Sequence, residues 1–234
     1  KHGQGFGLEN VLHVHHAKFG GIVNGVDYDV WNPEVDRYLP LRYGESTITR
    51  KYDVKRALRN RLWLADNEKP VVAYVGRLDP QKGLDLVRHA LWFCLHNRAQ
   101  FVLLGSAPDP AVNASFWNLK RQVNDSPDCH IELAFNEELS HLIYGGADMV
   151  IVPSQFEPCG LTQLIALRYG TVPIVREVGG LADTVIDKDH GHAPLDRRNG
   201  YVFRDYNAAG LESALGRAIA CPPGWRAPSD VRSL

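Results

Sequence analysis

The chain has 234 residues, of which 44% are apolar and 23% are charged, a composition typical of globular domains. Its formal net charge of −1 excludes a broad basic surface for nucleic acid or for an anionic membrane. No apolar run is long enough to span a bilayer, and the four cysteines are scattered without a C-x-x-C pair, which indicates free thiols. A small-molecule partner fits this composition better than a nucleic acid or a membrane.

The first 67 residues show no regular alternation of strands and helices. Residues 20–31 are rich in Gly and Asn, and residues 52–62 are predicted to form a helix. We interpret residues 1–67 as a connector, or hinge region, that follows an N-terminal domain outside this sequence.

From residue 70 onward, short apolar runs alternate with longer amphipathic stretches, as in β-α units that build a parallel sheet. The predicted strands are residues 71–75, 101–104, 130–134, 149–152 and 172–175. The predicted helices are residues 84–95, 115–123, 138–144, 161–169, 181–186 and 211–219. Residues 68–220 are therefore predicted to form an α/β domain with a Rossmann-like, doubly wound parallel sheet. Residues 221–234 contain Pro, Gly and Ser without periodicity and are predicted to be a disordered tail.

A first candidate motif, residues 76–83, follows the first strand of this domain and opens a helix. Arg77 and Lys82 place two cations at the carboxyl edge of the sheet, where they could meet a diphosphate. The alternative is a solvated turn, which an isolated R-x-x-x-x-K pattern usually is.

A second candidate motif, residues 153–162, also follows a strand. A helix that starts near Gly160, Leu161 and Thr162 presents free backbone N–H groups, which suit a phosphate. Glu157 would then lie close to the group attached to that phosphate. The alternative for Glu157 is a carboxylate that caps the helix.

Taken together and in this order, VGRLDPQKGLD, PSQFEPCGLTQL and GGLADTV resemble the starch synthases and bacterial glycogen synthases. The likeness runs from about residue 7 to residue 220, and GIVNGVDYDVWNP resembles the linker between the two domains of that family. The stretch from Ala134 to Gly170 looks most like a plant or algal soluble starch synthase of class III. The resemblance implies the C-terminal, donor-binding half of a two-domain GT-B glycosyltransferase.

The resemblance also implies an activity, the retaining transfer of glucose from ADP-glucose to the non-reducing end of an α-1,4-glucan. It implies that Arg77 and Lys82 neutralise the donor diphosphate and that Glu157 lies beside the glucosyl ring, and these three are the predicted catalytic residues. Phe135 matches an aromatic residue that stacks on adenine, with a core Phe as the alternative. The residues that the resemblance assigns to substrate binding are Gly76, Phe135, Cys159, Gly160, Leu161, Thr162, Gly179, Gly180 and Leu181.

No metal and no other cofactor is expected. Asp27-Tyr28-Asp29 and Asp187-Lys188-Asp189 both match the D-x-D pattern that holds a metal in another glycosyltransferase architecture. Arg77 and Lys82 would already supply the positive charge. The expected partners are ADP-glucose, the glucan and other starch-synthesis enzymes, in a plastid for a plant or algal protein and in the cytoplasm for a bacterial one.

Two rival interpretations remain. A sucrose- or trehalose-type glycosyltransferase would often carry a second glutamate eight residues after Glu157, where this chain has Ile165. A non-catalytic module could bind the nucleotide without turnover. Because catalysis in a cleft needs both walls, we expect the 234-residue chain alone to be inactive.

Overall fold

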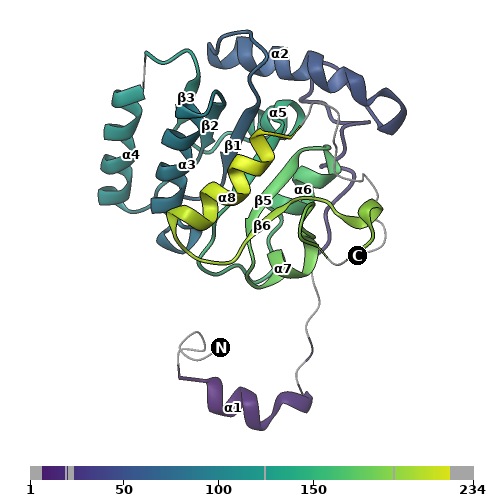
Figure 1. The fold of residues 1–234 in the computed structure, drawn as a ribbon, viewed down its shortest axis with the longest axis vertical. Coiled ribbons are helices and arrows are strands. Elements are labelled where there is room, and N and C mark those ends of the chain that lie inside the picture. The colour runs from purple at the N-terminus through teal and green to yellow at the C-terminus, as the bar shows by residue number, and fades with distance from the viewer. Residues whose placement is uncertain (1–6, 19, 21–23, 124, 192, 222–234) are drawn as a thin grey trace.

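The computed structural model describes residues 7–18, 20, 24–123, 125–191 and 193–221 (Figure 1). Its helices and strands, in chain order, are α1 Glu9–Val14, α2 Lys51–Leu62, β1 Val71–Val75, α3 Leu84–His96, β2 Gln100–Leu104, α4 Pro110–Val123, β3 Cys129–Glu132, α5 Glu137–Gly146, β4 Met149–Val152, α6 Thr162–Arg168, β5 Val172–Arg176, α7 Gly180–Thr184, β6 Tyr201–Phe203 and α8 Ala208–Ile219. Short 3₁₀ helices lie at His16–Lys18, Glu45–Arg50, Pro80–Lys82 and Leu195–Arg197. None of the described helices has the length and apolar content that crossing a bilayer requires.

The described strands form one parallel sheet in the order β3-β2-β1-β4-β5-β6. The chain starts in the middle at β1, builds outward to β3, and then returns to the other side of β1 with β4. This confirms the predicted doubly wound α/β fold. The direction of winding reverses between β1 and β4, which is the place where ligands bind in open sheets of this kind.

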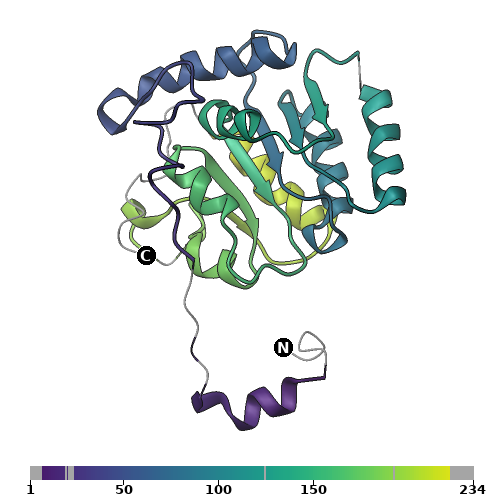
Figure 2. The ribbon, with the colours of Figure 1, turned by 180° about the vertical axis from the view of Figure 1, so that it is seen from behind.

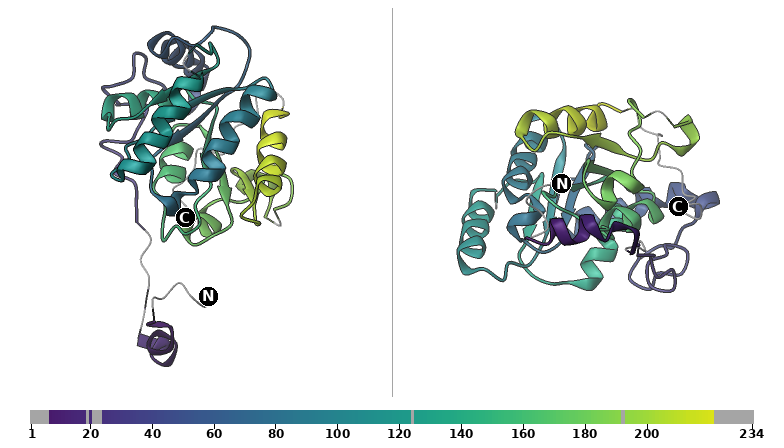
Figure 3. Two further views of the ribbon diagram at one scale, coloured as in Figure 1. Left: turned by 90° about the vertical axis from the view of Figure 1, so that its left-hand side faces the viewer. Right: turned by 90° about the horizontal axis from the view of Figure 1, so that it is seen from below.

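Helices cover both faces of the sheet, as the continuous apolar character of the strands predicts. Along β1, Val72 and Tyr74 pack with α3 and α8, whereas Val71 and Ala73 pack with α2 and α5 on the opposite face. Figures 1 and 2 show these two helix layers from opposite sides, and Figure 3 shows them from the side. The core is therefore a three-layer sandwich, and the loops at the carboxyl edge of the sheet rest on a rigid base.

The second half of the predicted connector packs on this domain. Val54 and Leu58 of α2 are fully buried in two of the core clusters. The Tyr43 hydroxyl donates to the carbonyl oxygens of Gly145, at 3.1 Å, and Tyr169, at 2.9 Å, at the ends of two helices. Residues from about 36 to 64 thus share the core of the domain, while the hinge role of residues 1–67 stays a prediction.

Two described elements were not among those expected from the sequence. The edge strand β6 and the helix α1 were not expected; β6 has three residues and α1 has six, too few for a periodic pattern. The predicted disordered tail, residues 221–234, lies outside the described residues except for Cys221.

Candidate functional site

Three loops meet at the carboxyl edge of the sheet, one after each of β1, β4 and β5. The backbone N–H of Gln155, after β4, donates to the carbonyl of Gln81, after β1, at 2.8 Å. The N–H of Gly180, after β5, donates to the carbonyl of Glu157 at 3.1 Å. The structure therefore brings the three motifs singled out in the sequence to one place, beside the switch point of the sheet.

The backbones of these loops approach so closely that two positions have room only for glycine. Gly83 has φ +74°, and a Cβ there would lie 2.2 Å from the carbonyl oxygen of Pro153. A Cβ on Gly180 would lie 2.2 Å from the carbonyl oxygen of Cys159. Contacts that short exclude any side chain, so glycine is what allows the loops after β1 and β5 to pack against the loop after β4.

The side chains of Lys82 and Glu157 form an ion pair across two of these loops. The Lys82 Nζ atom lies 2.6 Å from Glu157 Oε2, and the Ser154 hydroxyl donates to the same oxygen at 3.1 Å. Glu157 and Ser154 are buried, with exposed fractions of 7% and 0%. Two of the three predicted catalytic residues are thus in direct contact, and the supporting role of Ser154 was not predicted.

Arg77 lies on the same loop as Lys82 and is largely exposed to solvent. Its side chain is 66% exposed, and its guanidinium lies 3.3 Å from the Asp79 carboxylate. A cation in that position is available to an anionic ligand that approaches the loop after β1. Its assignment to the diphosphate stays a prediction.

Phe135 is 86% exposed at the end of the loop after β3. A core Phe would be buried, so this exposure contradicts that alternative and leaves the stacking role open as a prediction. Leu161, also assigned to substrate binding, is 43% exposed.

The turn before α6 is held by a residue that the sequence analysis missed. Gln163 is buried, and its Nε2 donates to the carbonyls of Cys159, at 3.0 Å, and Gly160, at 2.7 Å. The helix begins at Thr162, one residue later than predicted.

Arg176, at the end of β5, is a second residue that the sequence analysis missed. Its guanidinium donates to the carbonyl of Gln155 at 3.0 Å and, through Nε, to that of Arg204 at 3.2 Å. The Gln155 side chain in turn donates to the Tyr206 hydroxyl at 3.0 Å, and Tyr206 donates to Asp85. These bonds tie the end of β5 and the first turn of α3 to the loops after β4 and β6, and no local pattern marks them because every bond spans distant positions.

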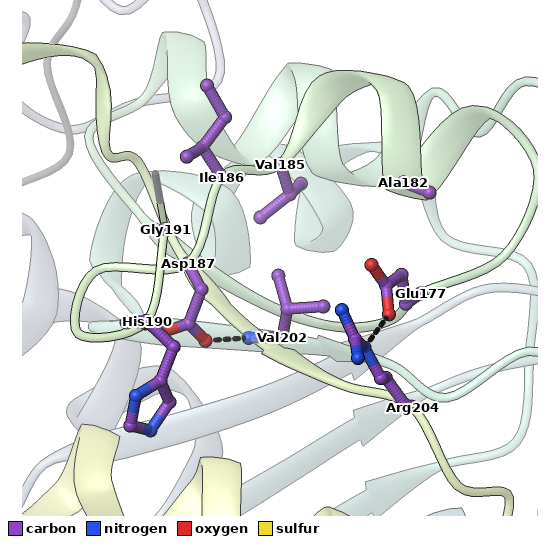
Figure 4. A pocket seen from close by; sticks show the side chains of 9 residues that line it. All are labelled: Glu177, Ala182, Val185, Ile186, Asp187, His190, Gly191, Val202 and Arg204. Carbon is purple, nitrogen blue, oxygen red and sulfur yellow. Dashed lines mark hydrogen bonds and ion pairs between the residues drawn. The ribbon is translucent and has the colours of Figure 1, made fainter. Parts of the chain in front are cut away.

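A separate hollow of about 480 Å³ lies along the edge strand β6 (Figure 4). Apolar side chains such as Val185 and Val202 line its middle, and the ion pair of Glu177 with Arg204 lies at one end. None of the predicted site residues lines it. The hollow is therefore distinct from the constellation around Lys82 and Glu157.

The carboxylates of Asp187 and Asp189, in the second D-x-D motif, contact an arginine. The Arg217 guanidinium contacts Asp187 through both of its terminal nitrogens at 3.0 Å and Asp189 at 2.8 Å. Within the described ranges, no group of three or more His, Cys, Asp or Glu side chains is arranged to hold a metal ion. That the protein works without a cofactor remains a prediction.

The fold and the three loops define a glycosyltransferase domain of the GT-B type. The family model "Glycosyl transferases group 1" matches residues 58–229, and the chain belongs to that family.

Curated relatives extend the comparison. The chain is 68% identical to glycogen synthase 2 of Methylococcus capsulatus over 99% of its own length and 47% of that protein. It is 56% identical to glycogen synthase 1 of Synechococcus sp. (strain JA-3-3Ab) over 98% of its length and 46% of that protein. The chain thus spans about half the length of the curated relatives that it matches.

Among solved structures, the chain resembles the catalytic domain of starch synthase IV from Arabidopsis thaliana, bound to ADP and acarbose. The TM-score is 0.89 at 42% identity, covering 92% of this chain and 44% of that one. The predicted resemblance to the starch and glycogen synthases is confirmed. The bacterial relatives are more similar in sequence than this plant enzyme, so the finer likeness to a plant or algal class III enzyme gains no support.

Proposed function

We propose that this chain is the donor-binding half of an ADP-glucose-dependent glycogen or starch synthase. The observation that carries the proposal is the ion pair of Lys82 with Glu157 at the switch point of the sheet, together with the exposed Arg77 on the same loop as Lys82. Two cations there suit a diphosphate, and a buried carboxylate beside them suits the hydroxyls of the attached glucose. The 68% identical glycogen synthase supports glucose transfer to an α-1,4-glucan as the reaction of the complete enzyme.

In this proposal the cations have an electrostatic task. They offset the charge that develops on the leaving diphosphate when its bond to the glucosyl carbon breaks. Glu157 stabilises the sugar through hydrogen bonds and offsets positive charge at the anomeric carbon. The wall of the cleft that holds the glucan would come from the half of the relatives' length that this chain does not match.

Calorimetric titration with ADP-glucose tests the proposal on the chain itself. Replacing Arg77 or Lys82 by Ala should weaken ADP-glucose binding on the order of tenfold or more, because each removes a charge-assisted contact to phosphate. Arg204→Ala is the matched control, since Arg204 is an 84% exposed arginine beside the hollow of Figure 4. Binding that is unchanged in the Arg77 and Lys82 variants would show that the diphosphate lies elsewhere.

A non-catalytic nucleotide-binding module is the competing function. Incubation of the 234-residue chain with labelled ADP-glucose and glycogen distinguishes binding from turnover. We expect no label in glucan, because one wall of the cleft cannot position the acceptor or exclude water. Incorporation at the rate of a complete synthase would contradict this expectation.

The bacterial relatives favour the cytoplasm as the location of the protein. A plastid location gains no support from these relatives. Association with other enzymes of glucan synthesis stays a proposal, which copurification from the source cells would test.

A further inference from the structure

The ion pair between Lys82 and Glu157 occupies the point where a diphosphate would meet Lys82. We infer that Glu157 is a gate that makes the site discriminate between a sugar nucleotide and the free nucleoside diphosphate. In the free chain Glu157 neutralises Lys82, and it releases Lys82 at low cost only to a ligand that carries a sugar. The inference rests on the proposed function, because it takes the ligand to be a nucleoside diphosphate sugar.

The geometry makes this pair costly to separate without compensation. The two charged atoms lie 2.6 Å apart, and the side chains of Lys82 and Glu157 are only 22% and 9% exposed. Water therefore screens their attraction weakly. The buried hydroxyl of Ser154, 3.1 Å from the same carboxylate oxygen, keeps Glu157 turned toward Lys82.

The two ligands differ in what they offer to Glu157. A free nucleoside diphosphate competes with Glu157 for the Lys82 ammonium, and it brings negative charge to a carboxylate that gains no partner in return. A sugar nucleotide brings the same phosphates together with hydroxyl groups that donate to Glu157. The carboxylate then exchanges one partner for another, as buried charges require.

Arg77 does not share this constraint. Its side chain is 66% exposed, and its ion pair with Asp79 has a separation of 3.3 Å. Arg77 thus attracts both ligands alike, and discrimination falls to Lys82 and Glu157. After glucose has been transferred, the re-formed pair would weaken the hold of the site on the product.

The test is a double-mutant cycle in which ADP and ADP-glucose are titrated separately into the purified chain. In Glu157→Gln the carboxylate charge is lost but the size and the bond to Ser154 are retained. ADP should bind this variant more tightly, on the order of tenfold, because Lys82 is no longer neutralised. ADP-glucose should gain less, since it loses its contact with the charged Glu157.

Three variants complete the design. Glu157→Ser also removes the carboxylate and should likewise tighten ADP binding. Agreement between the two variants would show that the gain does not depend on a property of Gln. In Lys82→Met the further change Glu157→Gln should tighten ADP much less, because it then relieves only the direct repulsion between Glu157 and the phosphates. Glu212→Gln removes one negative charge from α8, where Glu212 pairs with His89, and should leave both affinities unchanged.

The outcomes separate the two proposals. If the unaltered chain binds neither ligand, the proposed function is contradicted and the gate with it. If it binds both but Glu157→Gln fails to tighten ADP, only the gate is wrong. A gain in ADP affinity that is undiminished in the Lys82→Met background would also overturn the gate, because repulsion by Glu157 alone would then explain the difference.

Discussion

At the turn that follows α7, the Asp187 carboxylate accepts hydrogen bonds from Arg217 and from the backbone N–H groups of Asp189, His190 and Val202. Burial alone would raise the pKa of Asp187, but the bonds from Arg217 and the backbone outweigh it and lower the pKa to about 2. The ordinary value is 3.8. Asp187 thus stabilises the fold most above that ordinary value, and this contribution is lost as the pH falls through the folded value.

Replacing Asp187 by Asn should therefore lower the free energy of unfolding at pH 7 by about 2 kcal/mol, the equivalent of the pKa difference. The difference between the variant and the unaltered chain should shrink at pH 3, where the contribution of the carboxylate is partly lost. Urea unfolding at the two pH values measures both quantities. Asp183→Asn, an exposed aspartate on α7, is the control and should change neither. An equal loss of stability at pH 7 and pH 3 would contradict the electrostatic explanation.

Some single residues of the site could be predicted from sequence and others could not. Lys82 and Glu157 are 75 positions apart, yet both follow strands of a parallel sheet, whose carboxyl ends share one edge. Gln163 and Arg176 support the same loops through bonds to backbone carbonyls. The identity of a Gln or an Arg says nothing about which distant carbonyl it will meet, so these supporting residues emerge only from the structure.

At the scale of elements, the periodic segments were predicted well and the capped ends poorly. Strand β1 has the predicted bounds, residues 71–75, because its apolar run is bounded by Pro70 and Gly76. Helix α4 begins at Pro110, five residues before the predicted start at Ser115. The Asp109 carboxylate accepts from the N–H groups of Ala111 and Val112, a capping arrangement that apolar spacing does not detect.

Helix α8 also begins earlier than predicted, directly after a capping residue. It begins at Ala208 rather than at the predicted Leu211, with the Asn207 side chain accepting from the Gly210 N–H at 2.8 Å. The first turn of this helix has no large apolar residue and so adds nothing to a periodic pattern. Cap residues deserve the same weight as apolar spacing when helix ends are predicted.

At the scale of the whole molecule, the proposed donor site and the hollow along β6 are two separate places. The first joins loops after β1, β4 and β5, and the second runs beside the edge strand (Figure 4). A ligand in the hollow would contact Val185 and Val202, whereas a ligand at the loops would contact the surroundings of Lys82 and Glu157. The place where ADP-glucose binds on the chain therefore distinguishes the proposed donor site from the hollow.

Hydrogen–deuterium exchange of the chain, with and without saturating ADP-glucose, measures this location most directly. We expect slower exchange in residues 76–83, 155–163 and 178–181, which belong to the three loops. Residues 200–204 on the strand beside the hollow should exchange at the same rate in both conditions. Slower exchange confined to the lining of the hollow, or no change at a saturating concentration, would contradict the claim that this chain binds the sugar nucleotide at the switch point of its sheet.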